Sequence, residues 1–195
     1  MKYRTLIATT LLCGLTLWAA PAVAQDEDAA AVMEAWQKAG QPGTPHKQLA
    51  GLVGTWDAET KFWMDPSGEP MVTPTKMKYE MMMDGRFLME TVHSEFGGQQ
   101  FVGHGVYGYN NVTGKVQATW IDNMSSGIYA YEGSINEAGD EIVMMGKLMD
   151  PVTREWVKTR SVMKISADKL HYTSYETRGG EERKMMEITA TRAGT

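Results

Sequence analysis

Regularly spaced turn sequences are the feature that most constrains how this chain of 195 residues can fold. From Leu52 onward, apolar and polar residues alternate, which predicts strands that bury one face. Residues typical of turns interrupt the alternation nine times, and nine turns separate ten strands. These turn sequences are Asp65–Gly68, Asp84–Gly85, Gly97–Gly98, Asn110–Gly114, Asp122–Ser126, Asn136–Gly139, Asp150–Thr153, Ser166–Asp168 and Gly179–Gly180.

The short spacing between turns determines how the strands connect. Each strand with its turn takes roughly 14 residues, which is too few for a crossover helix, so neighbouring strands pair antiparallel as hairpins. Such a series tends to close into a barrel, because closure removes the exposed strand edges. We therefore predict an all-β fold, a roughly ten-stranded antiparallel up-and-down barrel over residues 46–195. A barrel wider than the eight-stranded kind leaves an interior that its own side chains need not fill.

The first 24 residues have the layout of a cleavable secretory signal. Lys2 and Arg4 precede an apolar run that ends before Ala22-Val23-Ala24, and this run is shorter than the ~20 residues that span a bilayer. We expect export to the bacterial periplasm or the medium, with no integral membrane segment left after cleavage. The single cysteine, Cys13, lies in this signal, so the mature domain must be stable without disulfides.

Residues 25–45 are predicted to be a helical lead-in and linker. The acidic residues 26–28 precede an alanine-rich stretch through Ala39, and acids at a helix start complement its dipole. The sequence Gly40-Gln41-Pro42-Gly43 ends this helix. A second brief helix is expected over residues 44–50, with a capping hydroxyl and a proline in its first turn.

Net charge limits the kind of partner. Removal of residues 1–24 leaves 17 basic and 24 acidic residues, a net charge of −7. An acidic chain without a basic cluster argues against binding to nucleic acid or to anionic membrane surfaces. Small neutral, apolar or amphipathic molecules fit better, and we expect a monomer or a weak dimer.

Four segments of the barrel region carry a resemblance to a known family. These are Leu49–Trp56 with its Gly-x-Trp start, Phe101–Asn110, Thr119–Gly127 and Met186–Arg192. Together they resemble the bacterial family called domain of unknown function 1579, over most of residues 46–192. The resemblance implies a calycin-type barrel related in shape to lipocalins and fatty-acid-binding proteins, and it implies no established activity. The methionine run at residues 81–83 departs from the ordinary aliphatic residues expected there.

Methionine and aromatic residues recur on the strand faces expected to point inward. The mature chain has 15 methionines, and they have three interpretations: a flexible wall for varied apolar ligands, an ordinary core, or a copper(I) site. Trp56 is interpreted as a structural plug at a closed end of the barrel. The candidate ligand-binding residues of the lumen are Tyr79, Met81, Met89, His93, Tyr107, Tyr109, Trp120, Asp122 and Tyr175.

Asp122 has two interpretations. At the end of a strand it is expected to bond its own backbone, or it stands at the barrel mouth as an acceptor or general base. In the second case His93 or His104 is the candidate partner in proton transfer. The histidines lack the His-x-His spacing of a strand metal site, and a haem-binding barrel is the remaining use for His93 or His171 as an axial ligand.

Motifs of common enzymes are missing from the sequence. It has no Gly-x-Ser-x-Gly elbow, phosphate loop or dinucleotide fingerprint. We therefore assign no catalytic residue, metal or cofactor. The leading hypothesis is an exported barrel that binds a small apolar or amphipathic ligand in its lumen. The alternatives are a structural or partner-binding envelope protein that uses an outer sheet face, and an enzyme acting on a lumen-bound substrate.

Overall fold

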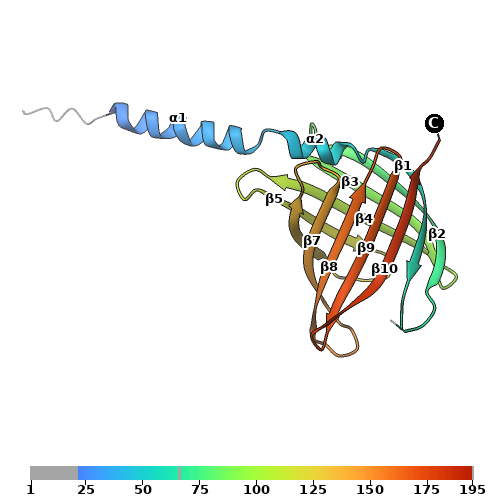
Figure 1. Cartoon of the computed structure of the whole chain (residues 1–195). Coiled ribbons are helices and arrows are strands. Elements are labelled where there is room, and N and C mark those ends of the chain that lie inside the picture. Colours follow the sequence, from blue (N-terminus) through green and yellow to red (C-terminus); the bar gives the residue numbers. More distant parts are fainter. Residues whose placement is uncertain (1–21, 66, 195) are drawn as a thin grey trace, which may run out of the picture. The chain divides into compact units, whose positions relative to one another are not determined.

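A computed structural model describes residues 22–65 and 67–194 of the chain (Figure 1). The chain divides after Trp36 into two compact units. Helix α1 (Ala22–Ala39) begins in the first unit and ends just beyond the boundary, and it confirms a helical lead-in that begins earlier than expected. In the described ranges, no helix combines the length and apolar character needed to cross a membrane. The predicted signal sequence falls mainly on residues 1–21, outside the described part, and stays a prediction.

The second unit is a closed barrel preceded by a short helix, α2 (Thr44–Ala50). Its ten strands are β1 (Gly54–Phe62), β2 (Met71–Met82), β3 (Phe87–Phe96), β4 (Gln99–Asn110), β5 (Lys115–Asp122), β6 (Tyr129–Ile135), β7 (Glu141–Met149), β8 (Trp156–Ile165), β9 (Lys169–Arg178) and β10 (Glu181–Arg192). Each pairs antiparallel with its neighbours in sequence, and β1 also pairs with β10, which closes the ring. The all-β up-and-down barrel and its nine turns are confirmed.

Tight turns fix the register of the barrel at two hairpins. Gly97 and Gly98 join β3 to β4 with φ angles of +59° and +80°. Gly179 and Gly180 join β9 to β10 with φ angles of +59° and +85°. Both residues of such a two-residue turn need positive φ, which glycine adopts at the least steric cost, so these glycine pairs determine where the strands reverse.

One end of the barrel is closed by packed side chains beside α2. Leu49 of α2, Leu52 and Trp56 are almost fully buried, and the Trp56 indole donates to the carbonyl of Leu52 at 2.9 Å. The Arg192 guanidinium stacks on the Trp56 ring, with 4.2 Å between its carbon and the ring centroid. It also donates to the carbonyls of Val53, Gly51 and Ala167 at 2.6, 2.9 and 2.9 Å. The plug therefore joins the start of β1 to the end of β10.

Replacement of Arg192 by lysine tests this closure. Lysine keeps the charge but lacks the planar fork that donates to three carbonyls while stacking on a ring. We expect Arg192→Lys to lower the free energy of unfolding by about 2 kcal/mol, measured by urea denaturation. The matched change Arg183→Lys, on the same strand, alters one exposed ion pair and should cost less than about 0.5 kcal/mol. Equal effects of the two substitutions would contradict a role for Arg192 in closing the barrel.

Candidate functional site

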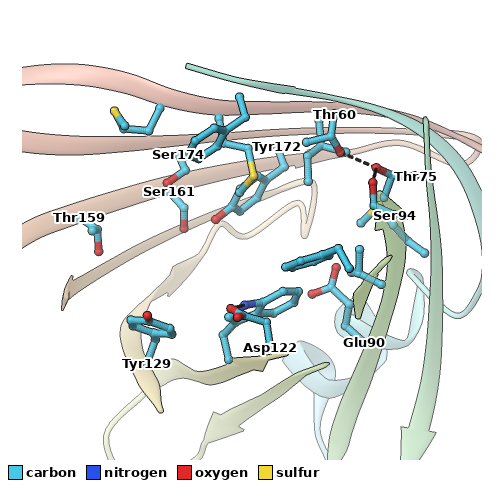
Figure 2. A pocket seen from close by; sticks show the side chains of 18 of the residues that line it. Thr60, Thr75, Glu90, Ser94, Asp122, Tyr129, Thr159, Ser161, Tyr172 and Ser174 are labelled. Atoms are coloured by element: carbon cyan, nitrogen blue, oxygen red, sulfur yellow. Dashed lines mark hydrogen bonds between the residues drawn. The ribbon is translucent and has the colours of Figure 1, made fainter. Parts of the chain in front are cut away.

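The barrel encloses a cavity of about 460 Å³. Its wall includes buried residues such as Tyr79 and extends to the strand ends opposite α2, where Phe62 and Phe96 pack edge to face at 5.4 Å. Figure 2 shows side chains from several strands converging on this space. The protein's own side chains therefore leave part of the interior empty. This agrees with the expectation from the number of strands.

The cavity wall is mainly apolar and rich in thioethers and rings. Seven methionines line it: Met71, Met77, Met124, Met144, Met163, Met185 and Met186. The aromatic residues of the wall are Phe62, Phe96, Phe101, Tyr79, Tyr107, Trp120, Tyr129, Tyr131 and Tyr172. Methionine side chains are unbranched and polarisable, so this wall can adapt to apolar surfaces of different shapes.

A buried carboxyl group lies among the lining side chains. Glu90 of β3 is 5% exposed, and its Oε1 accepts a hydrogen bond from the Tyr79 hydroxyl at 2.7 Å. Its Oε2 accepts from the Tyr107 hydroxyl at 2.8 Å. The register explains this arrangement, because β2 and β4 flank β3, with Glu90 opposite Tyr79 on one side and Gly105 on the other. A Cβ atom at Gly105 would lie 3.0 Å from Glu90 Oε2, so the glycine leaves room for the carboxyl group.

Burial changes the acidity of these three groups. Loss of solvent raises the pKa of Glu90, and the two tyrosine hydrogen bonds oppose this rise. Burial, followed by the charge of Glu90, raises the pKa of both Tyr79 and Tyr107 well above its ordinary value. The two hydroxyls therefore stay protonated and act as donors to the carboxyl group.

Hydroxyl groups form further polar positions on the wall. Thr75 shares hydrogen bonds with Thr60 at 2.8 Å and with Ser94 at 3.0 Å, across β1, β2 and β3 (Figure 2). Two other lining hydroxyls, Ser125 Oγ and Thr159 Oγ1, are buried and have no hydrogen-bond partner among the described residues. Because buried polar groups are nearly always paired, these two hydroxyls are available to another molecule.

Trp120 and Asp122 form one unit on the wall near the mouth. The Trp120 indole donates to Asp122 Oδ2 at 2.9 Å, and the backbone N–H of Met124 donates to Asp122 Oδ1 at 2.9 Å. The Trp120 ring stacks on Phe101 with centroids 6.4 Å apart, and it covers Gly103, where a Cβ atom would lie 2.2 Å from the ring. Asp122 therefore orients Trp120 and caps its own turn, and Gly103 makes space for the ring.

Four of the nine sequence-predicted lumen residues lie on the cavity wall: Tyr79, Tyr107, Trp120 and Asp122. Met81 and Tyr109 point inward as expected but pack against the core at the closed end. The Tyr109 ring meets the His46 ring of α2 edge to face at 5.9 Å. These two residues therefore belong to the layer beneath the cavity.

The structure places the other three, Met89, His93 and Tyr175, off the cavity wall, on the strand faces opposite the inward-pointing side chains. On β3 the inward positions are occupied by Leu88, Glu90, Val92 and Ser94, so Met89 and His93 point outward. On β9 Tyr172 faces the cavity, and Tyr175 lies under the guanidinium of Arg160, 4.2 Å from its ring centroid. Met83, the last residue of the methionine run, lies in the turn after β2 with a φ of +50°.

The histidines considered for proton transfer or haem ligation do not reach the cavity wall. His104 shares a 3.3 Å hydrogen bond with Thr91 on an exposed face, whereas Asp122 points inward. His171 contacts Thr173 at 3.2 Å and Thr189 at 3.5 Å on the outer face. The structure therefore does not bring Asp122 together with His93 or His104.

Sequence reasoning missed Glu90 and the cluster of hydroxyls. The sequence did contain a signal for Glu90: this acid stands two residues after Leu88 and two before Val92, so all three share one face of the strand. An inward-facing acid conflicts with the usual alternation, and the lumen residues predicted on this strand, Met89 and His93, lie on its opposite face.

Most of the chain matches the model of one protein family. The family described as "Protein of unknown function (DUF1579)" matches residues 41–192. The chain belongs to this family. The resemblance inferred from the four sequence segments is thereby confirmed. A search of curated proteins finds no match.

Two solved structures resemble the fold of this DUF1579 chain. One is Rv2717c from M. tuberculosis, with a TM-score of 0.60, 17% identity, and coverage of 79% of this chain and 100% of the other. The second is the S-type phycobiliprotein lyase CPES from Guillardia theta, with a TM-score of 0.54, 8% identity, and coverage of 82% and 97%. At such identities the likeness extends to the fold alone.

Gly103 provides a test of how the Trp120 wall is built in this DUF1579 barrel. We expect Gly103→Ala to displace the Trp120 ring and lower the free energy of unfolding by about 1–3 kcal/mol, measured by urea denaturation. Gly127→Ala is the control, since a Cβ atom there meets nothing closer than 3.9 Å. If Gly103→Ala is as stable as Gly127→Ala, the close packing of Trp120 on β4 is contradicted.

The raised pKa of Glu90 makes a prediction about stability. Above pH 4.5, the ordinary pKa of the side chain, the unfolded chain releases this proton before the folded protein does. The free energy of unfolding of the wild type therefore falls as pH rises, until Glu90 ionises in the folded protein. In the neutral variant Glu90→Gln this contribution to the fall in the free energy of unfolding with pH is absent.

We expect the stability of Glu90→Gln relative to wild type to increase with pH across this window, by at most about 1.4 kcal/mol per pH unit. Urea denaturation at a series of pH values from 4 upward measures the difference. A difference that stays constant with pH is inconsistent with a buried, destabilised carboxylate.

Proposed function

We propose that this protein binds a small apolar or amphipathic molecule in the lumen of its barrel. The lined cavity of about 460 Å³ carries the proposal. Ligand sites in proteins commonly enclose about 300–1,000 Å³, with mostly apolar walls and a few converging polar groups. Here the methionines and rings supply the apolar wall, and Glu90 and the lining hydroxyls supply the polar groups.

The arrangement of the barrel favours binding in the lumen over binding at an edge. The ring of ten strands leaves no unpaired strand edge to which an extended peptide could add. One end is plugged by Trp56 and Arg192, so a ligand enters from the opposite end. We further propose that binding takes place after export, because residues 1–24 have the layout of a secretory signal.

Obstruction of the mouth tests the proposal. Leu148 lines the cavity near the strand ends, and Leu148→Trp places a large ring in the path of a ligand. We expect this variant to bind the neutral fluorescent probe N-phenyl-1-naphthylamine about tenfold more weakly than wild type, since a tenfold loss corresponds to about 1.4 kcal/mol of steric cost. Fluorescence titration measures the dissociation constants.

The neighbouring substitution Met149→Trp is the matched control, because Met149 is 43% exposed and points away from the lumen. It should leave probe affinity close to that of wild type. Circular dichroism establishes that both variants are folded. Equal binding by the two variants, or no probe binding by wild type, counts against a ligand site in the lumen.

A further inference from the structure

The charges on the cavity wall are all of one sign. Among the described residues that line it, four are acidic, namely Glu90, Glu95, Asp122 and Glu176, and none is lysine, arginine or histidine. Arg178 neutralises Glu176 near the mouth, with 2.8 Å between Nη2 and Oε2. Asp122 accepts hydrogen bonds from Trp120 and from the backbone of Met124. Glu95 borders the cavity only at the exposed end of β3, one position after the inward-facing Ser94.

Glu90 differs from these three because it is buried, at 5% exposed, and its partners are neutral. Its two hydrogen bonds come from tyrosine hydroxyls, and it forms no ion pair with any of the described residues. An ionised carboxylate accepts about four hydrogen bonds, so roughly two acceptor positions remain unused. Figure 2 shows the carboxyl group of Glu90 directed into the space between the barrel walls. A cation in that space would offset the cost of burying the charge.

A second, independent observation also indicates an occupant with polar atoms. Thr159 on β8 is only 7% exposed, lines the cavity and has no hydrogen-bond partner for its hydroxyl among the described residues. Figure 2 shows Thr159 on a different part of the wall from Glu90. A ligand with one polar group at Glu90 and another near Thr159 would satisfy both positions. A purely hydrocarbon ligand would leave the Thr159 hydroxyl unpaired and the Glu90 carboxylate without a counterion.

We propose that the lumen selects an amphiphile that carries a protonated amine, with its ammonium group bound to the Glu90 carboxylate and its apolar part against the methionine and aromatic wall. This inference rests on the proposed lumen-binding function and adds the chemical class of the ligand. An anionic amphiphile such as a fatty acid is disfavoured, because its carboxylate would meet acidic side chains and no cationic side chain among the described residues of the wall. A neutral alcohol binds, but without an ion pair.

Three probes with the same alkyl chain separate these cases: decylamine, decanol and decanoate. A primary amine has a pKa near 10, so decylamine is protonated at pH 7. Competition against N-phenyl-1-naphthylamine, below the concentrations at which the probes form micelles, measures each affinity. We expect decylamine to bind about 10- to 100-fold more tightly than decanol, as for a hydrogen bond to a charged group, and decanoate to bind most weakly.

Substitution of Glu90 tests the assignment of the binding group. Glu90→Gln keeps the side-chain shape and removes its charge, so we expect the preference for decylamine over decanol to disappear while decanol affinity stays within about threefold. The control is Glu80→Gln, which removes an exposed acid from the outer face of the adjacent strand. It should keep the full preference for the amine.

A measurement on the wild type covers the case in which Glu90→Gln fails to fold. Decylamine affinity should fall as pH is lowered through the pKa of Glu90, because the ammonium binds the ionised carboxylate. Decanol affinity should not change over the same range. Calorimetry in buffers of different ionisation enthalpy should detect proton release when decylamine binds near that pKa.

The possible results distinguish this inference from the function on which it rests. Equal affinity for decylamine and decanol, or tighter binding of decanoate, overturns the amine preference and leaves lumen binding intact. Binding of none of the three probes, together with no binding of the naphthylamine dye, overturns both. A preference that survives in a folded Glu90→Gln variant excludes Glu90 as the binding group.

Discussion

Hydrogen bonding between the first and last strands is the interaction on which the rest of this structure depends. β1 pairs with β2 along one side and with β10 along the other, from Trp56 opposite Arg192 to Phe62 opposite Met186. Without this pairing the sheet would have two open edges and no enclosed volume. With it, ten strands form a ring wide enough that the inward side chains do not meet across the centre.

The two ends of the ring have different structures, and this difference determines where a ligand can lie. At one end α2, Trp56 and Arg192 form a layer that ties together the start and the end of the barrel. Above this layer the inward faces include glycines. Gly103 leaves room for the Trp120 ring, and Gly105 leaves room for the Glu90 carboxyl group. The stable plug therefore allows the remaining interior to stay open.

The polar groups of the interior oppose the stability of the barrel. Burial raises the pKa of the Glu90 carboxyl group, because the hydrogen bonds from the two tyrosine hydroxyls oppose this rise but do not fully replace water. Ser125 and Thr159 hold buried hydroxyls without partners among the described residues. Groups of this kind destabilise an empty barrel, and under the function proposed above a bound ligand would offset that cost.

Local sequence signals predicted the fold well, whereas the site required knowledge of the strand register. The glycine pairs at 97–98 and 179–180 act within their own hairpins, so the positions of the turns and the number of strands could be predicted. The contact between Glu90 and its two tyrosines joins residues 11 and 17 positions apart on three strands, and only the pairing register brings them together.

The sequence pattern also could not predict how deep a side chain lies in the barrel or which face of a strand meets the cavity. Tyr109 shares the inward face of β4 with Tyr107 but packs against His46 at the plug. β9 has a tyrosine on each face, and its inward face also carries Ser174 and Glu176, so alternation of polarity did not distinguish Tyr172 from Tyr175. The alternating pattern identifies two faces of a strand, and the arrangement of neighbouring strands decides which face a cavity meets.

The central claim is that a closed ten-stranded barrel leaves a lined, accessible space in its interior. A crystal structure determined under xenon pressure tests it most directly, because xenon occupies apolar cavities and is readily located by its scattering. We expect xenon beside Met77 and Met163, inside a ring in which β1 pairs with β10. An interior filled by side chains with no bound xenon, or an open sheet in which β1 and β10 are apart, would contradict it.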